Sequence, residues 1–216
     1  MEKNKIIHWD SLEYMRTLPD KCIDLVLTDP PYWIWESGKS NHSRGKLAKA
    51  KQYKDFWWDN FIPSKEYFDE IKRISKNAII WGWNYFIEYL DNSSCWIVWD
   101  KDNWDTDFAD CELAWTNFSS AVRKKKFKWQ GMLQESMKNK EVRHHPTQKP
   151  KELFKWCLEN YSKPWDIILD CFAWSGTTAV ACIETGRNYI VIEKEKDYID
   201  IIHKRVKNTN TPLFTI

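Results

Sequence analysis

Short apolar runs alternate along the chain with stretches whose apolar residues recur every three or four positions. The short runs predict strands, and the recurring spacing predicts amphipathic helices. Strands are expected at residues 5–9, 23–29, 77–82, 95–100, 111–115, 166–172 and 188–193, and helices at 64–75, 150–162, 175–186 and 197–206. This alternation predicts an α/β fold with a mostly parallel sheet, and the neighbouring runs 95–100 and 111–115 predict an antiparallel pair at one edge.

Two long stretches, residues 33–56 and 119–145, lack this pattern and are rich in Lys and Arg. The second stretch holds eight basic residues against two acidic ones. Each can be read as a solvated loop, but loops this long in a compact domain are more often functional, and basic loops suit a phosphate backbone. The candidate contacts to such a backbone are Arg44, Lys46, Lys49, Lys51, Arg123, Lys124, Lys125, Lys126 and Lys128.

Composition narrows the class of protein only slightly. The 216 residues suit a single domain over 1–216, and the formal net charge of +2 points to no class of partner. Six scattered cysteines without a CxxC pair argue against a zinc site and a disulfide framework. The chain shows no signal-peptide core and no run of 18 apolar residues, so we expect a cytoplasmic protein without a membrane partner.

The motif Thr28-Asp-Pro-Pro-Tyr32 directly follows a predicted strand. Ligands of open α/β sheets bind beyond the carboxyl ends of strands, and two successive prolines make this turn stiff. The Asp29 carboxylate and the Pro30 carbonyl can each accept one hydrogen of an exocyclic NH₂ group, while the Tyr32 ring can lie on a base. The motif therefore predicts a site that holds an aromatic amine by its edge and face.

A second motif, residues 166–178, runs from a strand that ends in Asp170 into Ser175-Gly-Thr-Thr178, which opens a helix. The N–H groups at a helix N-terminus suit a carboxylate or phosphate. Glu193 ends the next strand, 17 positions beyond Gly176, close to the roughly 20 expected for an acid that grips ribose hydroxyls. The spacing alone predicts a nucleoside-binding unit, and a nicotinamide dehydrogenase would fit almost as well.

Together with HPTQKP at residues 145–150, which alone reads as a polar helix-entry loop, these motifs resemble the β-class DNA amino-methyltransferases of bacteria and phages. The resemblance spans nearly the whole chain and keeps that class's motif order. It implies S-adenosylmethionine as cofactor and a Rossmann-like seven-stranded sheet, circularly permuted so that the catalytic half comes first. Within the class, DPPY is usual for N6-adenine and SPPY for N4-cytosine.

The resemblance also implies roles for individual residues. The flipped base would be held by Asp29, Pro30, Pro31 and Tyr32. The cofactor would be held by Asp10, Thr147, Gln148, Lys149, Asp170, Phe172, Ser175, Gly176, Thr177, Thr178 and Glu193, with Glu193 on the ribose and Thr147 to Lys149 near the methionine end. The reaction would be a direct methyl transfer to a flipped-out adenine, needing no metal because the leaving group is a neutral thioether.

The sequence is also compatible with three other functions. They are N4-cytosine specificity on the same fold, a catalytically impaired DNA-binding protein, and methylation of another amine or amide. The partner is expected to be double-stranded DNA, and a homodimer and a cognate restriction enzyme stay open as further partners. The basic segment 119–145 would be the target-recognition region.

Tryptophan is unusually frequent, with 15 residues against only six glycines. Seven tryptophans stand where the class, or the turn itself, favours glycine: Trp9, Trp33, Trp35, Trp83, Trp104, Trp165 and Trp174. Seven more glycines would give 13, about 6% of the chain and near the usual share of roughly 7%. We hypothesise that one codon read as Trp, with UGA the candidate, specifies glycine, and we expect Trp174, if present, to crowd the cofactor's methionine end. The rival readings are a degenerate pseudoenzyme and a deliberately altered chain.

Overall fold

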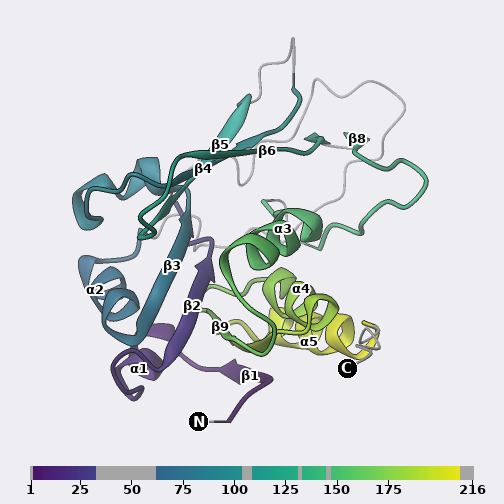
Figure 1. Cartoon of the computed structure of the whole chain (residues 1–216). Coiled ribbons are helices and arrows are strands. Elements are labelled where there is room, and N and C mark those ends of the chain that lie inside the picture. Colours follow the sequence, from purple (N-terminus) through teal and green to yellow (C-terminus); the bar gives the residue numbers. More distant parts are fainter. Residues whose placement is uncertain (1, 33–61, 104–108, 131–132, 145–146, 210–216) are drawn as a thin grey trace.

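An eight-stranded sheet forms the centre of the computed structural model, which describes residues 2–32, 62–103, 109–130, 133–144 and 147–209 (Figure 1). Its strands in spatial order are β1 (Lys5–His8), β10 (Asn188–Glu193), β9 (Ile167–Asp170), β2 (Ile23–Thr28), β3 (Ser75–Trp81), β5 (Cys111–Thr116), β4 (Trp96–Asp100) and β6 (Arg123–Lys126). Neighbouring strands are parallel except for the two pairs that β5 makes. This confirms the predicted mostly parallel α/β sheet and the antiparallel pairing of β4 with β5.

Strands from the early and late parts of the chain pair with each other in this sheet. The strand β9, from the last third of the chain, pairs with β2 near its start, with Leu25 opposite Ile168 and Val26 opposite Leu169. The first strand, β1, pairs with the last, β10, along its whole length. The Thr28–Tyr32 motif after β2 and the Ser175–Thr178 motif after β9 are therefore neighbours, in the permuted order that the resemblance implies.

Helices cover both faces of the sheet (Figure 1). On one face lie α1 (Ser11–Arg16) and α2 (Lys65–Ile74), and on the other lie α3 (Lys151–Tyr161), α4 (Thr177–Thr185) and α5 (Lys196–Lys207). The helix α2 buries Tyr67, Phe68, Ile71 and Ile74, the spacing of one helical face. Each face thus has its own apolar core, and the molecule has three layers.

The remaining elements are short. Two 3-10 turns, η2 (Trp83–Tyr85) and η3 (Ile87–Tyr89), follow β3, and a two-stranded ribbon pairs β7 (Trp129–Gln130) with β8 (Leu133–Gln134). In the part of the chain that the structure describes, no helix is long and apolar enough to span a membrane.

Three expectations need correction. The main sheet has eight strands instead of seven, because β6 adds outside β4, so the antiparallel pair does not lie at the edge. The stretch 119–145 is not a plain loop, since it contains β6, β7 and β8. The run of four basic residues in β6 has no apolar alternation to reveal a strand, and backbone pairing with β4 forms it. The short helix α1, which the pattern did not predict, begins after the cap Asp10.

Candidate active site

The motifs singled out in the sequence meet at one edge of the sheet. The strands β10, β9 and β2 are parallel neighbours in this order. They end at Glu193, Asp170 and Thr28 respectively. The carboxyl ends of parallel strands share one edge, where ligands of such sheets bind. Fold and motif therefore agree on the position of the site.

Asp29 lies directly beyond β2 in a buried cluster of charges. Its Oδ2 accepts a hydrogen bond from Lys149 Nζ at 2.6 Å, across 120 positions of sequence. The same ammonium lies 3.0 Å from Glu112 Oε2, and Glu112 pairs with Lys101 at 2.5 Å. Two ammonium groups thus balance two carboxylates, and Tyr32 accepts a further, longer hydrogen bond from Lys149 at 3.4 Å.

The cluster controls the protonation of its members. Burial raises the pKa of Asp29, and the charge of Lys149 opposes that rise. Burial alone would lower the pKa of Lys149, but Asp29 and Glu112 raise it well above its usual value. Burial likewise opposes the charge of Glu112, yet Lys149 and Lys101 lower its pKa. Lys149 is therefore held as an ammonium beside Asp29.

The two carboxylate oxygens of Asp29 differ in their hydrogen bonding. Asp29 Oδ1 is buried and accepts no hydrogen bond from the described residues. A buried carboxylate oxygen without a donor is costly, and such atoms are usually explained by function or by a missing ligand. This oxygen is a ready acceptor for an N–H group.

Tyr32 has one of its faces covered. Its ring stacks on Tyr85, with centroids 4.5 Å apart and planes within 7° of parallel. Gly82, at φ +70°, lets the ring come close, because a Cβ there would lie 2.6 Å from Tyr32. A base stacked on Tyr32 must use the other face or displace Tyr85. Sequence reasoning missed both Tyr85 and Glu112, since neither belongs to a motif.

Asp170 organises the loop after β9. Its Oδ1 accepts hydrogen bonds from Thr28 at 2.7 Å and from the Phe172 N–H at 3.1 Å, and its Oδ2 accepts one from Thr178. Burial raises the pKa of Asp170 to about 6, and these donors oppose the rise. The carboxylate ties β2, β9 and α4 together, so its contacts are structural ones.

Gly176 is the N-cap residue of α4 and has the left-handed conformation, at φ +78°. A Cβ on it would lie 2.9 Å from Ile202 of α5, so close packing as well as backbone angle favours glycine here. Thr177 and Thr178 then form the first turn of α4. Ser175 and Thr177, at the start of this helix, line the small cavity between the motifs.

Glu193 and Asp10 lie at the ends of neighbouring strands. Glu193 accepts backbone N–H groups from Trp174 at 2.8 Å and Glu195 at 2.9 Å, one on each oxygen. Burial raises its pKa to about 7 against these hydrogen bonds. The backbone N–H of Lys194 also favours the ionised carboxylate. Asp10 is engaged as the cap of α1, where its Oδ1 accepts from the backbone N–H groups of Leu12 and Glu13.

The segment from Thr147 to Lys149 connects both motifs. Gln148 Oε1 accepts a hydrogen bond from the Ser175 hydroxyl at 3.1 Å, and Gln148 Nε2 donates to Glu141 at 2.9 Å. Arg205 of α5 closes this network, donating to Ser175 and pairing with Glu141 at 3.1 Å. Lys149 points to Asp29, which the resemblance did not imply. Glu141 and Arg205 carry no motif, and only the structure assigns them to this network.

Trp174 fills the space that a cofactor would need. Its indole Nε1–H donates to the Asp29 carbonyl oxygen at 3.0 Å, and its ring meets Tyr198 edge to face. The cavity between the motifs has a volume of only about 20 Å³, and one water needs roughly 10–15 Å³. The polar groups around it suit a nucleoside cofactor, but with Trp174 in place a molecule as large as S-adenosylmethionine does not fit. The cavity is lined by Asp29, Thr147, Gln148, Lys149, Phe154, Asp170, Phe172, Ala173, Trp174, Ser175 and Thr177.

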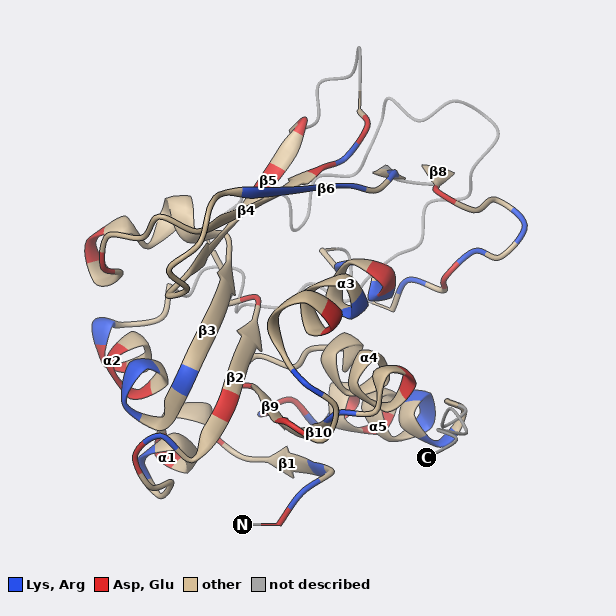
Figure 2. Cartoon of the chain, in the orientation of Figure 1, with Lys and Arg blue, Asp and Glu red and all other residues tan. Residues whose placement is uncertain are grey.

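The basic residues of β6 form a stripe on one edge of the molecule (Figure 2). Lys124 pairs with Asp100 at 3.1 Å, and Lys126 and Lys128 pair with Asp102 at 2.7 and 3.0 Å. Arg123 and Lys125 form no ion pair with the described residues. The four candidates in 33–56 lie outside the described residues, as does His145.

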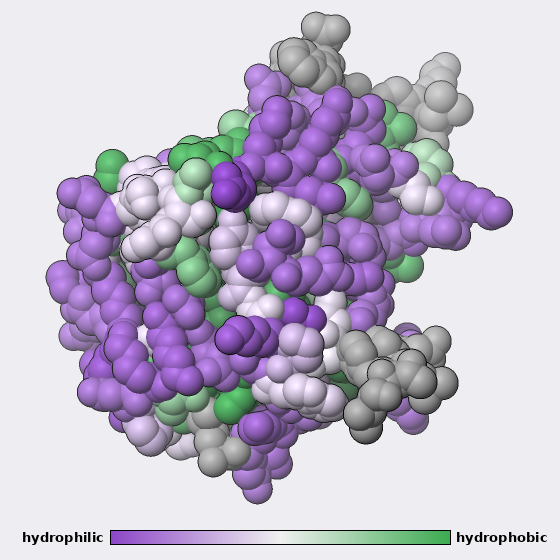
Figure 3. Space-filling view, viewed as in Figure 1, coloured by the Kyte–Doolittle hydropathy of each residue, from purple (hydrophilic) through white to green (hydrophobic). Residues whose placement is uncertain are grey.

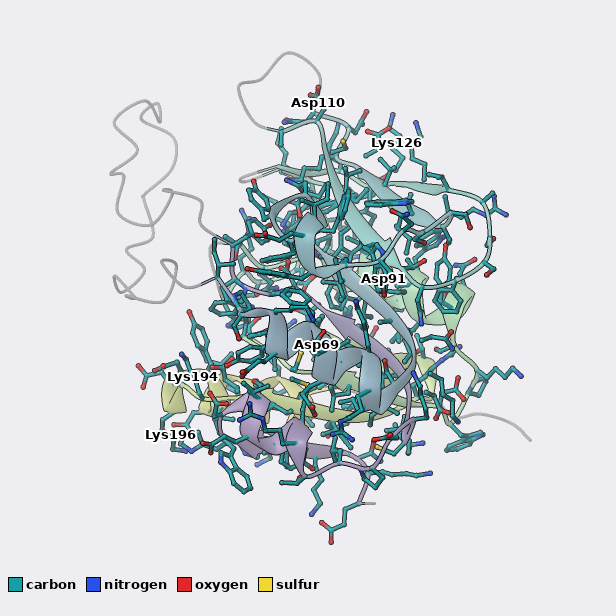
Figure 4. All side chains as sticks on the ribbon, turned by 90° about the vertical axis from the view of Figure 1, so that its left-hand side faces the viewer. Asp69, Asp91, Asp110, Lys126, Lys194 and Lys196 are labelled. Carbon is teal, nitrogen blue, oxygen red and sulfur yellow. The ribbon has the colours of Figure 1, made fainter. Side chains whose placement is uncertain are left out.

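A second and larger cavity, of about 550 Å³, shares Glu141 and Arg205 with the network around Gln148. It is lined by Glu141, His144, Lys151, Val180, Glu184, Ile201, Lys204, Arg205, Asn208 and Thr209. The face seen in Figure 3 is hydrophilic over most of its described area, with hydrophobic residues in small patches. The basic residues of β6 are separate from the lysines at the start of α5. In Figure 4, Lys126 lies at one end of the molecule, and Lys194 and Lys196 lie toward the other. Among the described residues, no group of three or more His, Cys, Asp or Glu side chains could hold a metal ion.

Comparison with solved structures relates the fold to DNA methyltransferases. The M1.HpyAVI–SAM complex superposes with a TM-score of 0.58 at 25% identity, covering 93% of this chain and 98% of the other. The cytosine-N4-specific PvuII DNA methyltransferase superposes with a TM-score of 0.62 at 16% identity, covering 95% and 86%, a likeness of fold alone.

Sequence comparison identifies the family. The Type II methyltransferase M.HinfI of Haemophilus influenzae is 31% identical, over 94% of this chain and 68% of the relative. A family model for N6 and N4 methyltransferases, described as DNA methylase, matches residues 59–204. The chain therefore belongs to the N6/N4 DNA methylase family, the amino-methyltransferases of DNA.

Proposed function

We propose that this family member transfers a methyl group from S-adenosylmethionine to the exocyclic N6 of an adenine flipped out of double-stranded DNA. The observation that carries this proposal is the buried Asp29 Oδ1, which has no donor among the described residues and lies in the stiff turn beyond β2. The motif supports adenine over cytosine, because DPPY is usual for N6-adenine methylation in the class that the sequence resembles, whereas SPPY is usual for N4-cytosine.

In this proposal, the residues around Asp29 hold the adenine and orient its N6. The adenine N6 is a poor nucleophile, because its lone pair is delocalised into the ring. Hydrogen bonds from N6–H to Asp29 Oδ1 and to the Pro30 carbonyl oxygen favour a more tetrahedral nitrogen and localise that lone pair. Lys149 keeps Asp29 in place through Oδ2 and favours its ionised form. Orientation supplies most of the acceleration in such a site.

The DNA backbone is the proposed partner of β6. Arg123 and Lys125 alternate with the paired lysines along the strand, so the two side chains share one face of the sheet. Neutralising phosphates with such residues gives affinity without sequence preference. Base-specific contacts belong to other residues of the proposed target-recognition region 119–145.

The test is incorporation of labelled methyl groups into unmethylated DNA, followed by digestion and identification of the modified nucleoside. It is run on the chain and on a sevenfold variant with glycine at positions 9, 33, 35, 83, 104, 165 and 174. We expect N6-methyladenine from the glycine variant, and a loss of about 100-fold or more when Asp29→Asn is added. Activity that survives Asp29→Asn would contradict the role of Asp29.

N4-cytosine methylation is the second candidate, because the PvuII enzyme of this specificity shares the fold. The same digest decides between the two, since N4-methylcytosine would replace N6-methyladenine. Bound DNA without methyl transfer by either protein would indicate an impaired, binding-only member of the family.

A further inference from the structure

Trp174 has a backbone conformation that tryptophan rarely adopts. Its φ is +48°, and that of Trp165 is +73°. Of the described non-glycine residues, only Asn4, Lys21 and Asp102 share this left-handed region, and Asn and Asp tolerate it best. For a bulky residue such a conformation is an outlier, whereas glycine adopts it without strain.

The surroundings of these two tryptophans differ from those of the core tryptophans. Trp99 and Trp115 are almost fully buried, and their indole N–H groups donate to the backbone carbonyls of Phe127 and Asp91. Trp165 is 68% exposed, in the turn before β9. The core residues are placed as tryptophans normally are, but Trp165 gains little from burial to offset its backbone strain.

The position of the Trp174 side chain in the site is the second observation. Its indole lies between the Asp29 carbonyl and Tyr198 and leaves the cavity only about 20 Å³. The backbone N–H of the same residue donates to Glu193, and this contact needs no side chain. Removal of the indole would open the cavity while the loop keeps its hydrogen bond to β10.

We infer that glycine occupies positions 165 and 174 in the protein that the source cell makes, and that glycine at 174 opens the cofactor cavity. One codon with a non-standard meaning accounts for both positions, and also for Trp9, Trp33, Trp35, Trp83 and Trp104. The structure supports 165 and 174 through their backbone angles. Trp9 and Trp83 lack this feature, and the other three lie outside the described residues.

The gene sequence and the protein isolated from its source test directly whether glycine occupies positions 165 and 174. Trypsin should release residues 156–187 as one peptide, because Lys163 precedes Pro164. The peptide contains Trp165, Trp174 and also Trp156, which serves as the internal control. We expect its fragment spectrum to show Trp at 156 and glycine at 165 and 174, with one codon shared by the seven positions and UGG at Trp99 and Trp115. Tryptophan at 165 and 174, or UGG at both, would overturn the inference.

Calorimetric titration with S-adenosylmethionine, without DNA, tests whether glycine at position 174 opens the cofactor cavity. This part of the inference rests on the cofactor proposed above and is independent of which base is methylated. We expect Trp174→Gly to bind at least tenfold more tightly than the Trp174 chain. Trp165→Gly is the matched control, since it makes the same change at a left-handed position away from the cavity, and it should leave binding unchanged.

Two outcomes would refute the role of position 174. One is equal binding by the Trp174 chain and the Trp174→Gly variant. The other is no binding by a Trp174→Gly variant that melts cooperatively at or above the temperature of its parent. Failure of the function assignment gives a different result, because a variant that binds the cofactor but methylates no DNA would leave the cavity inference intact.

Discussion

At the scale of single residues, the state of Asp29 depends on a charge balance that extends beyond the DPPY motif. Lys149 is shared by Asp29 and Glu112, and Glu112 is shared by Lys149 and Lys101. Removing one partner from a buried ion network leaves an uncompensated charge, which costs more than the pair contributes. The identity of residue 112 should therefore affect both stability and the position of Lys149.

Glu112→Gln should lower the free energy of unfolding by about 3–5 kcal/mol, because the buried Lys149 would keep only Asp29 and the partly buried Lys101 would lose its partner Glu112. Urea denaturation at pH 7 measures this change. Glu66→Gln is the control, since Glu66 forms an exposed pair with Arg16 and should change stability little. A Glu112→Gln variant as stable as its parent would show that the cluster is not balanced in this way.

Glu193 should make stability depend on pH in the opposite sense to an ordinary paired carboxylate. Its folded pKa of about 7 lies above the ordinary value of 4.5, so between these values the folded state binds more protons and stability falls as pH rises. The loss should be about 2–3 kcal/mol between pH 5 and pH 8. Glu193→Gln should remove this component, as measured by urea denaturation at both pH values. Parallel pH profiles of the two proteins would argue against the raised pKa.

At the scale of elements, β6 shows how backbone pairing can form a strand that side chains alone do not specify. Residues 123–126 are all basic, which is unfavourable beside one another on an edge strand, but Asp100 and Asp102 at the end of β4 neutralise two of them. An edge strand with charged side chains also resists pairing with other chains. The same element leaves Arg123 and Lys125 available for phosphates.

Arg123→Gln combined with Lys125→Gln should weaken DNA binding about equally for all sequences. If each side chain contacts one phosphate, the slope of log affinity against log salt should fall by about 2. Fluorescence anisotropy over a series of salt concentrations measures both effects. The comparison variant, Lys124→Gln with Lys126→Gln, should have a smaller effect, because Asp100 and Asp102 already hold these lysines. An unchanged slope would place β6 outside the DNA contact.

At the scale of the whole molecule, the pairing of β2 with β9 joins the base-binding half to the cofactor-binding half. Thr28 spans the junction, since its hydroxyl donates to Asp170 across 142 positions of sequence. Both residues are fully or almost fully buried. The two halves should therefore unfold together, with the junction contributing to the stability of both.

Thr28→Val should lower the free energy of unfolding by about 1–3 kcal/mol, because it leaves a buried carboxylate oxygen with one donor fewer. Thr185→Val makes the same chemical change within α4, where the hydroxyl only donates to a carbonyl oxygen already in the helix, and should cost less. Urea denaturation followed by both fluorescence and circular dichroism should give one transition. Two separate transitions would show that the halves are independent.

Much of the fold could be predicted because each parallel strand is a continuous apolar run and each long helix has a clear apolar face. β10 was predicted with its observed bounds, 188–193. The predictions failed where those signals are absent. β6 has no apolar residue, and α1 is too short for a periodicity to emerge. In both cases contacts with the rest of the molecule stabilise what local sequence does not.

The sequence by itself determined the family, the order of the motifs and the edge of the sheet where they meet, because these depend on local patterns and on the rule that parallel strands end together. Only the tertiary structure decided that Lys149 contacts Asp29, that Glu112 completes their charge balance, and that the indole of Trp174 donates to the Asp29 carbonyl oxygen. These contacts join residues far apart in the chain. Their distances and burial, which set the energies, exist only once the sheet and its helices have packed together.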